Sequence, residues 1–143
     1  MRVGHAHSAL GGRPSSQAVT WTLVGMALLA GCAKRIAPED LLAQIETEAA
    51  PIIVDVRSER EFTQARVPGA IHIPFWALAT RLDRLPEDSG ARPVVVYCEH
   101  GPRAGIARAQ LWLAGRRPVL YLQGHMSGWR RRGLPVTRGA PEP

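Results

Sequence analysis

Residues 94–103 read VVVYCEHGPR, and this stretch decides the fold. A short run of β-branched apolar residues predicts a buried strand of a parallel sheet. From residue 104 to residue 113 the apolar side chains recur at helical spacing, and Gly115 ends the pattern. The sequence therefore predicts that Cys98 lies between the end of a strand and the start of a helix, where open α/β sheets bind their ligands.

This position favours a reactive thiol at Cys98. Backbone N–H groups of a tight loop and the N-terminus of a helix both stabilise a negative charge, so they favour the thiolate form of a cysteine. A buried structural cysteine is the alternative, and it is the more common fate of a free cysteine. We favour the reactive interpretation because a glycine, a proline and an arginine follow at positions 101 to 103.

The composition is that of an ordinary globular protein. Of the 143 residues, 45% are hydrophobic and 21% are charged, and this length suffices for one domain with a core. The net charge of +6 comes without a DNA-binding motif, so we expect a solvated basic surface that attracts small anions, and no nucleic-acid partner. Two cysteines, Cys32 and Cys98, exclude a framework of several disulfides.

Residues 1–31 predict a lipoprotein signal peptide. They carry Arg2 and Arg13, no acidic residue, and an apolar run over 18–30 that is short for a membrane span. Residues 29–32 read LAGC, which resembles the bacterial lipobox, in which the chain is cut before the cysteine and the cysteine is lipidated. An uncleaved membrane anchor is the alternative.

Lipidation of Cys32 would place the protein in the bacterial cell envelope, facing the periplasm. Residues 32–36 would then form the lipidated cysteine and a short tether, whose Lys34 and Arg35 would lie near anionic head groups. Cys98 would be the only free thiol of the mature chain.

Short apolar runs that predict strands alternate with amphipathic segments that predict helices. The strands are expected near residue 36 and at 52–56, 70–73, 94–98 and 119–122, and the helices at 38–45, after Ser58, at 76–85 and at 104–113. This alternation is typical of an α/β fold with a mostly parallel sheet flanked by helices. We expect a single domain over 37–136 and a flexible tail over 137–143.

Taken together, these residues resemble the rhodanese, or sulfurtransferase, superfamily. Cys98–Arg103 is similar to the C-x-x-G-x-R active-site loop of that superfamily, and Asp55–Arg57 matches its D-x-R. Residues 67–74 match the second half of its G-H-I-P-G-A-x-x-I-P segment, and residues 122–135 match L-x-G-G-x-x-x-W-x-x-x-G-x-P with one exception. The resemblance covers most of the predicted domain.

The resemblance implies a sulfurtransferase that uses no cofactor and no metal. Cys98 would take a sulfane sulfur from a small anionic donor such as thiosulfate, hold it as a persulfide, and pass it to cyanide or a thiol. Asp55 and Arg57 would support the loop structurally, and the protein would be a monomer. The implied substrate-binding residues are Glu99, His100, Gly101, Pro102, Arg103 and Ala104.

Several charged residues near the loop have specific expected roles. Glu99 is expected to repel an anionic donor, by about 1 kcal/mol or less after screening. Arg103 either stabilises an anion at the rim of the site or supports the loop by pairing with an acid. The spacing allows Arg57 to pair with Glu61 at the strand–helix junction, and Glu61 also has the spacing of a capping box with Ser58.

His125 is the exception in the last motif, because it replaces the second glycine. A left-handed backbone at this position would cost a histidine some strain. The loop that carries His125 should share a sheet edge with Cys98, and the side chain either faces the site or does not. His72 is expected to be structural, and Arg130–Arg132 to form a solvated face, with membrane contact as the alternative.

Four other functions are less favoured by the same sequence. A cysteine phosphatase of this fold needs C-x₅-R, and its arginine position is occupied here by Ala104. A lipid-anchored module could bind sulfur or sense oxidants through Cys98 with little turnover, and Glu99 supports this alternative. A metal site of Cys98, His100 and His125 would need two loops to converge. A thioredoxin-type oxidoreductase would need a second cysteine in C-x-x-C.

The lipobox resemblance yields a direct test. We expect a Cys32→Ser variant expressed in a bacterium to lose lipid labelling and signal cleavage, because the modified thiol is gone. Radiolabelled palmitate and N-terminal sequencing measure the two events. A parent chain that already partitions into the aqueous phase, with an N-terminus ahead of Cys32, would contradict lipid anchoring.

Overall fold

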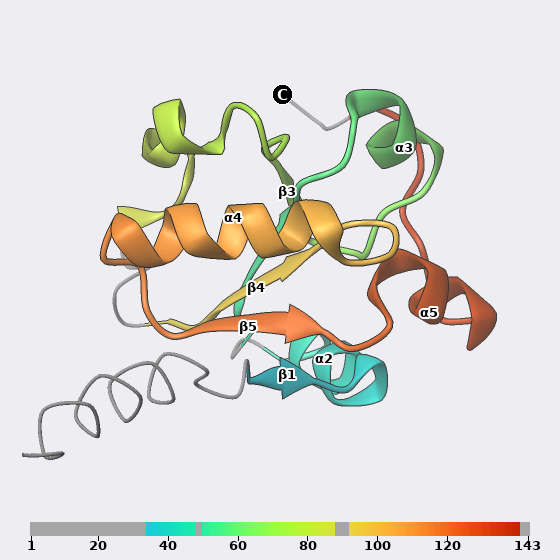
Figure 1. Ribbon diagram of the computed structural model, residues 1–143. Helices are drawn as coiled ribbons and strands as arrows, with labels where there is room; N and C mark the ends of the chain where they lie inside the picture. The colour runs from blue at the N-terminus through green and yellow to red at the C-terminus, as the bar shows by residue number, and fades with distance from the viewer. Residues whose placement is uncertain (1–33, 48–49, 88–91, 141–143) are drawn as a thin grey trace, which may run out of the picture. The chain divides into compact units, whose positions relative to one another are not determined.

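Parallel strands form the centre of the structure, and helices lie on both sides of them (Figure 1). The computed structural model describes residues 34–47, 50–87 and 92–140, so the predicted signal peptide and Cys32 lie outside it. Within these residues, none of the helices has both the length and the apolar character that crossing a membrane requires.

The predicted α/β fold with a parallel sheet flanked by helices is confirmed. The sheet has five strands in the order β1-β5-β4-β2-β3, and every neighbouring pair is parallel. The elements are β1 (Arg35–Ile36), α2 (Pro38–Ile45), β2 (Ile52–Asp55), α3 (Glu59–Gln64), β3 (Ile71–His72), the 3₁₀ turns η1 (Leu78–Thr80) and η2 (Leu82–Arg84), β4 (Val94–Tyr97), α4 (Pro102–Leu113), β5 (Val119–Leu122) and α5 (His125–Arg131).

The strand order places the end of β4 at a switch point of the sheet. After β2 the chain continues to β3 on one side, and after β4 it continues to β5 on the other side. The carboxyl ends of parallel strands share one edge of the sheet, and the connections leave a crevice where they diverge. Cys98 follows β4 at this edge, as the sequence predicts.

Alternation along the strands divides the core into two layers. Val94, Val96 and Cys98 belong to the cluster that α4 covers, whereas Val95 and Tyr97 belong to the cluster on the opposite face. The α4 layer also contains Ala104, Ala107 and Leu111, and the opposite layer contains Leu41, Met126 and Trp129. All the β4 side chains are buried, which explains why β4 reads as a continuous apolar run.

The predicted capping box at the start of α3 is confirmed. The Ser58 hydroxyl accepts a hydrogen bond from the Glu61 backbone N–H at 3.3 Å, and the Glu61 carboxylate accepts one from the Ser58 backbone N–H at 3.0 Å. These bonds satisfy N–H groups that have no partner inside the helix. The Glu61 carboxylate is therefore fixed close to the end of β2.

The helix predicted over 76–85 is wrong. The chain forms η1 and η2 instead, because the backbone leaves helical geometry at Arg81, where φ is −128° and ψ is 33°. This break still buries Leu78 and Leu85, so the apolar spacing serves the core without a helix. Trp76, expected on the apolar face, is 62% exposed.

The ordered chain continues past the domain boundary predicted at residue 136. Thr137 forms an antiparallel bridge with Arg66, and the Gly139 backbone N–H donates to the Thr63 carbonyl at 2.9 Å. The Arg66 guanidinium also donates to the Gly139 carbonyl at 2.7 Å. Residues 137–139 are thus held against the chain that follows α3, which corrects the predicted flexible tail at these positions.

Asp55 and Arg57 form a buried ion pair at the end of β2. The Arg57 Nη2 lies 2.7 Å from Asp55 Oδ2, with exposures of 1% and 0% for the two side chains. The predicted pair of Arg57 with Glu61 is therefore wrong, because the carboxylate two residues before Arg57 takes its guanidinium. Burial alone would lower the pKa of Arg57, but the hydrogen bonds and charge of Asp55 outweigh burial and raise it.

The free energy of unfolding should depend strongly on the buried Asp55–Arg57 pair. We expect Asp55→Asn to lower the free energy of unfolding by about 3–5 kcal/mol, because it removes the fully buried counter-charge of a buried guanidinium. Glu39→Gln is the matched control, since the Glu39–Arg132 pair is solvent-exposed and should cost about 0–1 kcal/mol. Urea unfolding measures both, and equal losses in the two variants would contradict a special role for the buried pair.

Candidate active site

Cys98 is buried directly after β4, beneath the loop that follows it. The Gly101 backbone N–H donates to the Cys98 Sγ at 3.0 Å, so the loop turns back over the sulfur. Gly101 has φ 129°, a conformation that L side chains rarely adopt, and it immediately precedes α4. The predicted placement of this cysteine between strand, tight loop and helix is confirmed.

The first turn of α5 holds the same loop from the other side. The Met126 backbone N–H donates to the Cys98 carbonyl at 3.0 Å, and the Ser127 backbone N–H donates to the Glu99 carbonyl at 3.3 Å. These N–H groups belong to a helix start, where no partner inside the helix exists. The backbone of the loop is therefore fixed by α5 as well as by α4.

Arg103 supports the loop by pairing with an acid, the second of its two predicted roles. Its Nη1 and Nη2 bind the two carboxylate oxygens of Glu61 at 2.7 and 2.8 Å. The hydrogen bonds from Arg103 are the main reason that the pKa of Glu61 is lowered to about 2. The same hydrogen bonds raise the pKa of Arg103. The guanidinium thus ties the start of α4 to the start of α3.

Glu99 is paired with arginine on two sides, which corrects the expectation of an uncompensated charge. Its Oε2 lies 3.1 Å from Arg57 Nη1, and its Oε1 contacts Arg130 Nη2. Arg130 is therefore not simply part of a solvated face, because it joins α5 to the Cys98 loop. The carboxylate is 17% exposed, so these contacts are partly shielded from water.

His125 faces the site, and its backbone is left-handed with φ 53°. Its Nδ1 accepts a hydrogen bond from the Cys98 backbone N–H at 3.5 Å. Its ring also lies against Gly101, where an added Cβ would come within 3.2 Å of Nε2. Burial, followed by the charges of Arg35 and His100, lowers the pKa of His125, which favours the neutral ring.

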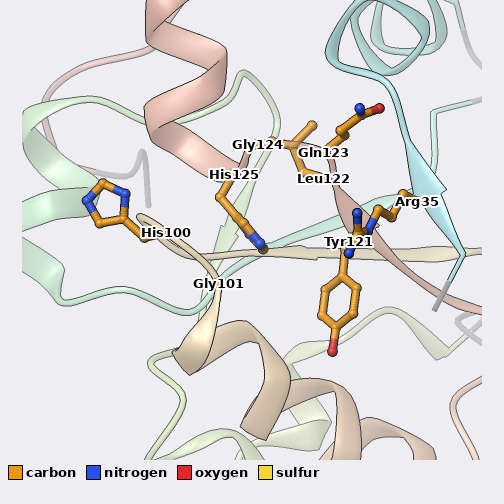
Figure 2. Close-up of a pocket in the computed structure, with 8 residues that line it drawn as sticks. All are labelled: Arg35, His100, Gly101, Tyr121, Leu122, Gln123, Gly124 and His125. Atoms are coloured by element: carbon orange, nitrogen blue, oxygen red, sulfur yellow. The ribbon is translucent and has the colours of Figure 1, made fainter. Parts of the chain in front are cut away.

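A pocket of about 420 Å³ opens beside the loop, on the side of β5 and β1 (Figure 2). His125 and Arg35 reach into it from opposite sides, while the His100 ring points away from its centre. It is lined by Arg35, His100, Gly101, Tyr121, Leu122, Gln123, Gly124 and His125. Sequence reasoning did not identify Arg35, Tyr121 or Gln123 as site residues, although their places at the ends of two predicted strands offered a signal.

The other residues singled out from the sequence have structural positions. Pro102 and Ala104 lie in the first turn of α4, and Ala104 is fully buried in the core. His72 is structural, as expected: its Nε2 lies 3.0 Å from the Arg57 carbonyl, and its ring stacks on Phe62 at 4.8 Å. Among residues 34–47, 50–87 and 92–140, no three His, Cys, Asp or Glu side chains are grouped as metal ligands would be.

The arrangement is suited to nucleophilic chemistry on an anion. A thiol sits beneath an N–H donor, and the first turn of α4 directs further N–H groups and a positive helix end toward the same region. The charged side chains around the loop are mutually paired, so they hold its shape while the backbone supplies the donors. Such fixed donors stabilise negative charge that develops during a reaction.

Several known proteins are similar to this chain. Residues 37–132 match the family model of the rhodanese-like domain. The chain is 37% identical over 91 residues to a sulfurtransferase of Allochromatium vinosum, covering 64% of this chain and 80% of that protein. It is 34% identical to the thiosulfate sulfurtransferase GlpE of Actinobacillus succinogenes, covering 71% and 87%. A solved rhodanese-related protein of Thermoplasma volcanium superimposes with TM-score 0.62 at 27% identity, covering 73% and 97%.

The pairing of Glu99 changes what its removal should do. We expect Glu99→Gln to lower the free energy of unfolding by about 1–2 kcal/mol, because charge-assisted hydrogen bonds to Arg57 and Arg130 are lost. We expect kcat/KM for thiosulfate to stay at or below that of the parent, since the two arginines already balance the carboxylate. Thermal unfolding and steady-state rates at several ionic strengths measure both effects.

Glu59→Gln is the matched control for this prediction. Glu59 is an exposed acid of α3, and its substitution removes the same charge away from the loop. A gain of three- to tenfold in kcat/KM for Glu99→Gln alone, shrinking as salt rises, would show that the carboxylate acts on the donor as an uncompensated charge.

Proposed function

This chain belongs to the rhodanese-like domain family, and we propose that it is a sulfurtransferase that carries a sulfane sulfur as a persulfide on Cys98. The observation that carries the proposal is the Cys98 Sγ itself, held 3.0 Å from the Gly101 N–H at the carboxyl end of a central strand. Cys98 is the free cysteine of the described residues. The donor is a small anion such as thiosulfate, and the acceptor is cyanide or a thiol.

In the first half-reaction, the Cys98 thiolate attacks the outer sulfur of thiosulfate. A bond forms between that sulfur and Sγ, the original S–S bond of the donor breaks, and its electron pair leaves with sulfite. The negative charge stays close to the loop throughout. The N–H of Gly101 and the unpaired N–H groups of the first α4 turn would stabilise it, which is the role of fixed donors in anionic transition states.

In the second half-reaction, a nucleophile removes the outer sulfur from Cys98. The acceptor forms a new bond to that sulfur, the bond to Sγ breaks, and the electron pair returns to Cys98 as thiolate. The electrons balance without an external oxidant or reductant, and no metal or organic cofactor takes part in this scheme. The loop begins and ends the cycle in the same state, so its rigid support favours repeated turnover.

Two features oppose a phosphatase reaction at this site. Arg103 binds Glu61 with both terminal nitrogens, so it does not reach over the sulfur to surround a phosphate. The position that a C-x₅-R loop would give to arginine holds Ala104, which is fully buried. A short loop with one N–H on the sulfur suits a single transferred sulfur atom better than a phosphoryl group.

We also propose that the enzyme is anchored by a lipid on Cys32 and works in the cell envelope, facing the periplasm. The support is the LAGC sequence at 29–32 and the short chain between Cys32 and β1. This tether would hold the catalytic domain close to the bilayer.

Persulfide formation is the decisive measurement. We expect the full chain, incubated with thiosulfate and then freed of small molecules, to gain the mass of one sulfur atom. A Cys98→Ser variant should show no gain and no thiosulfate:cyanide transfer, because a hydroxyl is a far weaker nucleophile than a thiolate. Intact mass spectrometry and thiocyanate release measure these results.

The control is a variant of the loop that keeps the thiol, Glu99→Gln, which should still form the persulfide. Circular dichroism should show that Cys98→Ser retains the fold, since the substitution is nearly isosteric. Residual transfer within tenfold of the parent in Cys98→Ser would overturn the assignment of the nucleophile. A stable persulfide without transfer to any acceptor would favour a sulfur-binding or redox-sensing module.

A further inference from the structure

The pocket beside the Cys98 loop is much larger than the proposed sulfur donor requires. Its volume of about 420 Å³ lies in the range of sites that hold small organic molecules. The loop residues His100 and Gly101 form one wall, so the pocket begins where the Cys98 loop ends. A molecule that fills it would therefore lie next to the Cys98 loop.

Arg35 is the arginine among the residues that line this pocket, and its guanidinium carries a permanent positive charge. It lies in β1 directly opposite Tyr121 of β5, and Tyr121 lies opposite Val96 of β4. Residues in register across a parallel sheet point to the same face, so Arg35 shares the face of Val96 and of Cys98, two residues further along. Among the residues that the structure describes, no acidic side chain forms an ion pair with Arg35, which leaves its charge available to a ligand.

Neutral donors complete the site for an anion. The Nδ1 of His125 accepts the Cys98 N–H, so the neutral ring carries its proton on Nε2. His125 and Arg35 enter the pocket from opposite sides (Figure 2). The charged or titratable groups that face His125 are Arg35, His100 and Tyr121, whose ring lies edge-on to the His125 ring at 6.0 Å. A carboxylate between these groups would meet one full charge and further hydrogen-bond donors.

The spacing of the sheet limits the kind of ligand. β1 and β4 are separated by β5, so their backbones are about 10 Å apart. An organic molecule can span this separation and fill the pocket, whereas thiosulfate would occupy only a small part of its volume. A small organic acceptor with a thiol at one end and a carboxylate at the other is long enough.

We propose that this pocket binds the carboxylate of the sulfur acceptor, and that Arg35 makes the enzyme prefer small carboxylate-bearing thiols to neutral ones. The inference rests on the proposed sulfurtransferase function. The acceptor thiolate attacks the outer sulfur of the Cys98 persulfide, a new S–S bond forms, and the bond to Sγ breaks with its electron pair returning to Cys98. The products are the acceptor persulfide and the free Cys98 thiolate.

The test compares two acceptors that share the same thiol and differ in whether their carboxylates are free or esterified. The full chain, purified in detergent and loaded with sulfur from thiosulfate, is given either glutathione or its diethyl ester, whose carboxylates are masked. We expect Arg35→Gln to raise KM for glutathione by about three- to fivefold, the upper range for one exposed ion pair. The kcat for glutathione and the KM for the diester should stay within about twofold of the parent.

Two further variants separate the local charge from general effects. Arg84→Gln removes an exposed arginine of η2, outside the pocket lining, and should leave both acceptors unchanged. Arg35→Lys keeps the charge and should restore part of the preference. Equal KM values of Arg35→Gln and parent for glutathione, or a parent that uses the diester as well as glutathione, would overturn the proposal.

A binding measurement keeps this inference separate from the catalytic proposal. In the Cys98→Ser background, S-methylglutathione should bind in isothermal titration calorimetry, and adding Arg35→Gln should weaken binding about three- to fivefold. If no persulfide forms in the parent, the proposed function fails. The binding result still shows whether Arg35 helps to hold a carboxylate-bearing ligand in the pocket. If the persulfide forms but Arg35→Gln leaves binding unchanged, the function stands and the pocket assignment fails.

Discussion

The buried guanidinium of Arg57 is the constraint on which the rest of the site depends. It is 1% exposed, so each of its N–H groups needs a partner inside the protein. Asp55 binds it at the end of β2, the Ala65 carbonyl binds it at the end of α3 at 2.6 Å, and Glu99 binds it from the Cys98 loop. One side chain thereby joins three segments that meet at the carboxyl edge of the sheet.

The other ionic contacts extend this support without placing a free charge on the sulfur. Arg103 joins α4 to α3 through Glu61, and Arg130 joins α5 to the loop through Glu99. Because these guanidinium groups are paired, the donors closest to Cys98 are backbone N–H groups, whose positions the helices fix. Such fixed donors are suited to stabilising negative charge at the sulfur.

His125 connects the loop to the pocket beside it. A histidine in the left-handed region is strained relative to glycine, by about 1 kcal/mol, yet here the ring has contacts that glycine could not make. It accepts the Cys98 N–H, packs against Gly101, and forms a wall of the pocket opposite Arg35. The strained position thus places the His125 ring between the Cys98 loop and the pocket.

The sequence by itself determined the elements whose signals are local. The apolar run of β4, the capping box of Ser58 and Glu61, and the turn at Gly101 depend on neighbouring residues, so their strand, helix start and tight loop were predictable. Tertiary structure decided which charges pair: Glu99 contacts residues 42 and 31 positions away, and Arg103 contacts one 42 positions away. It also broke the expected helix after Trp76 and placed Arg35 beside His125. The charge pairs follow from the parallel strand order, which brings the ends of distant segments together. The spacing of residues within one segment does not reveal that order.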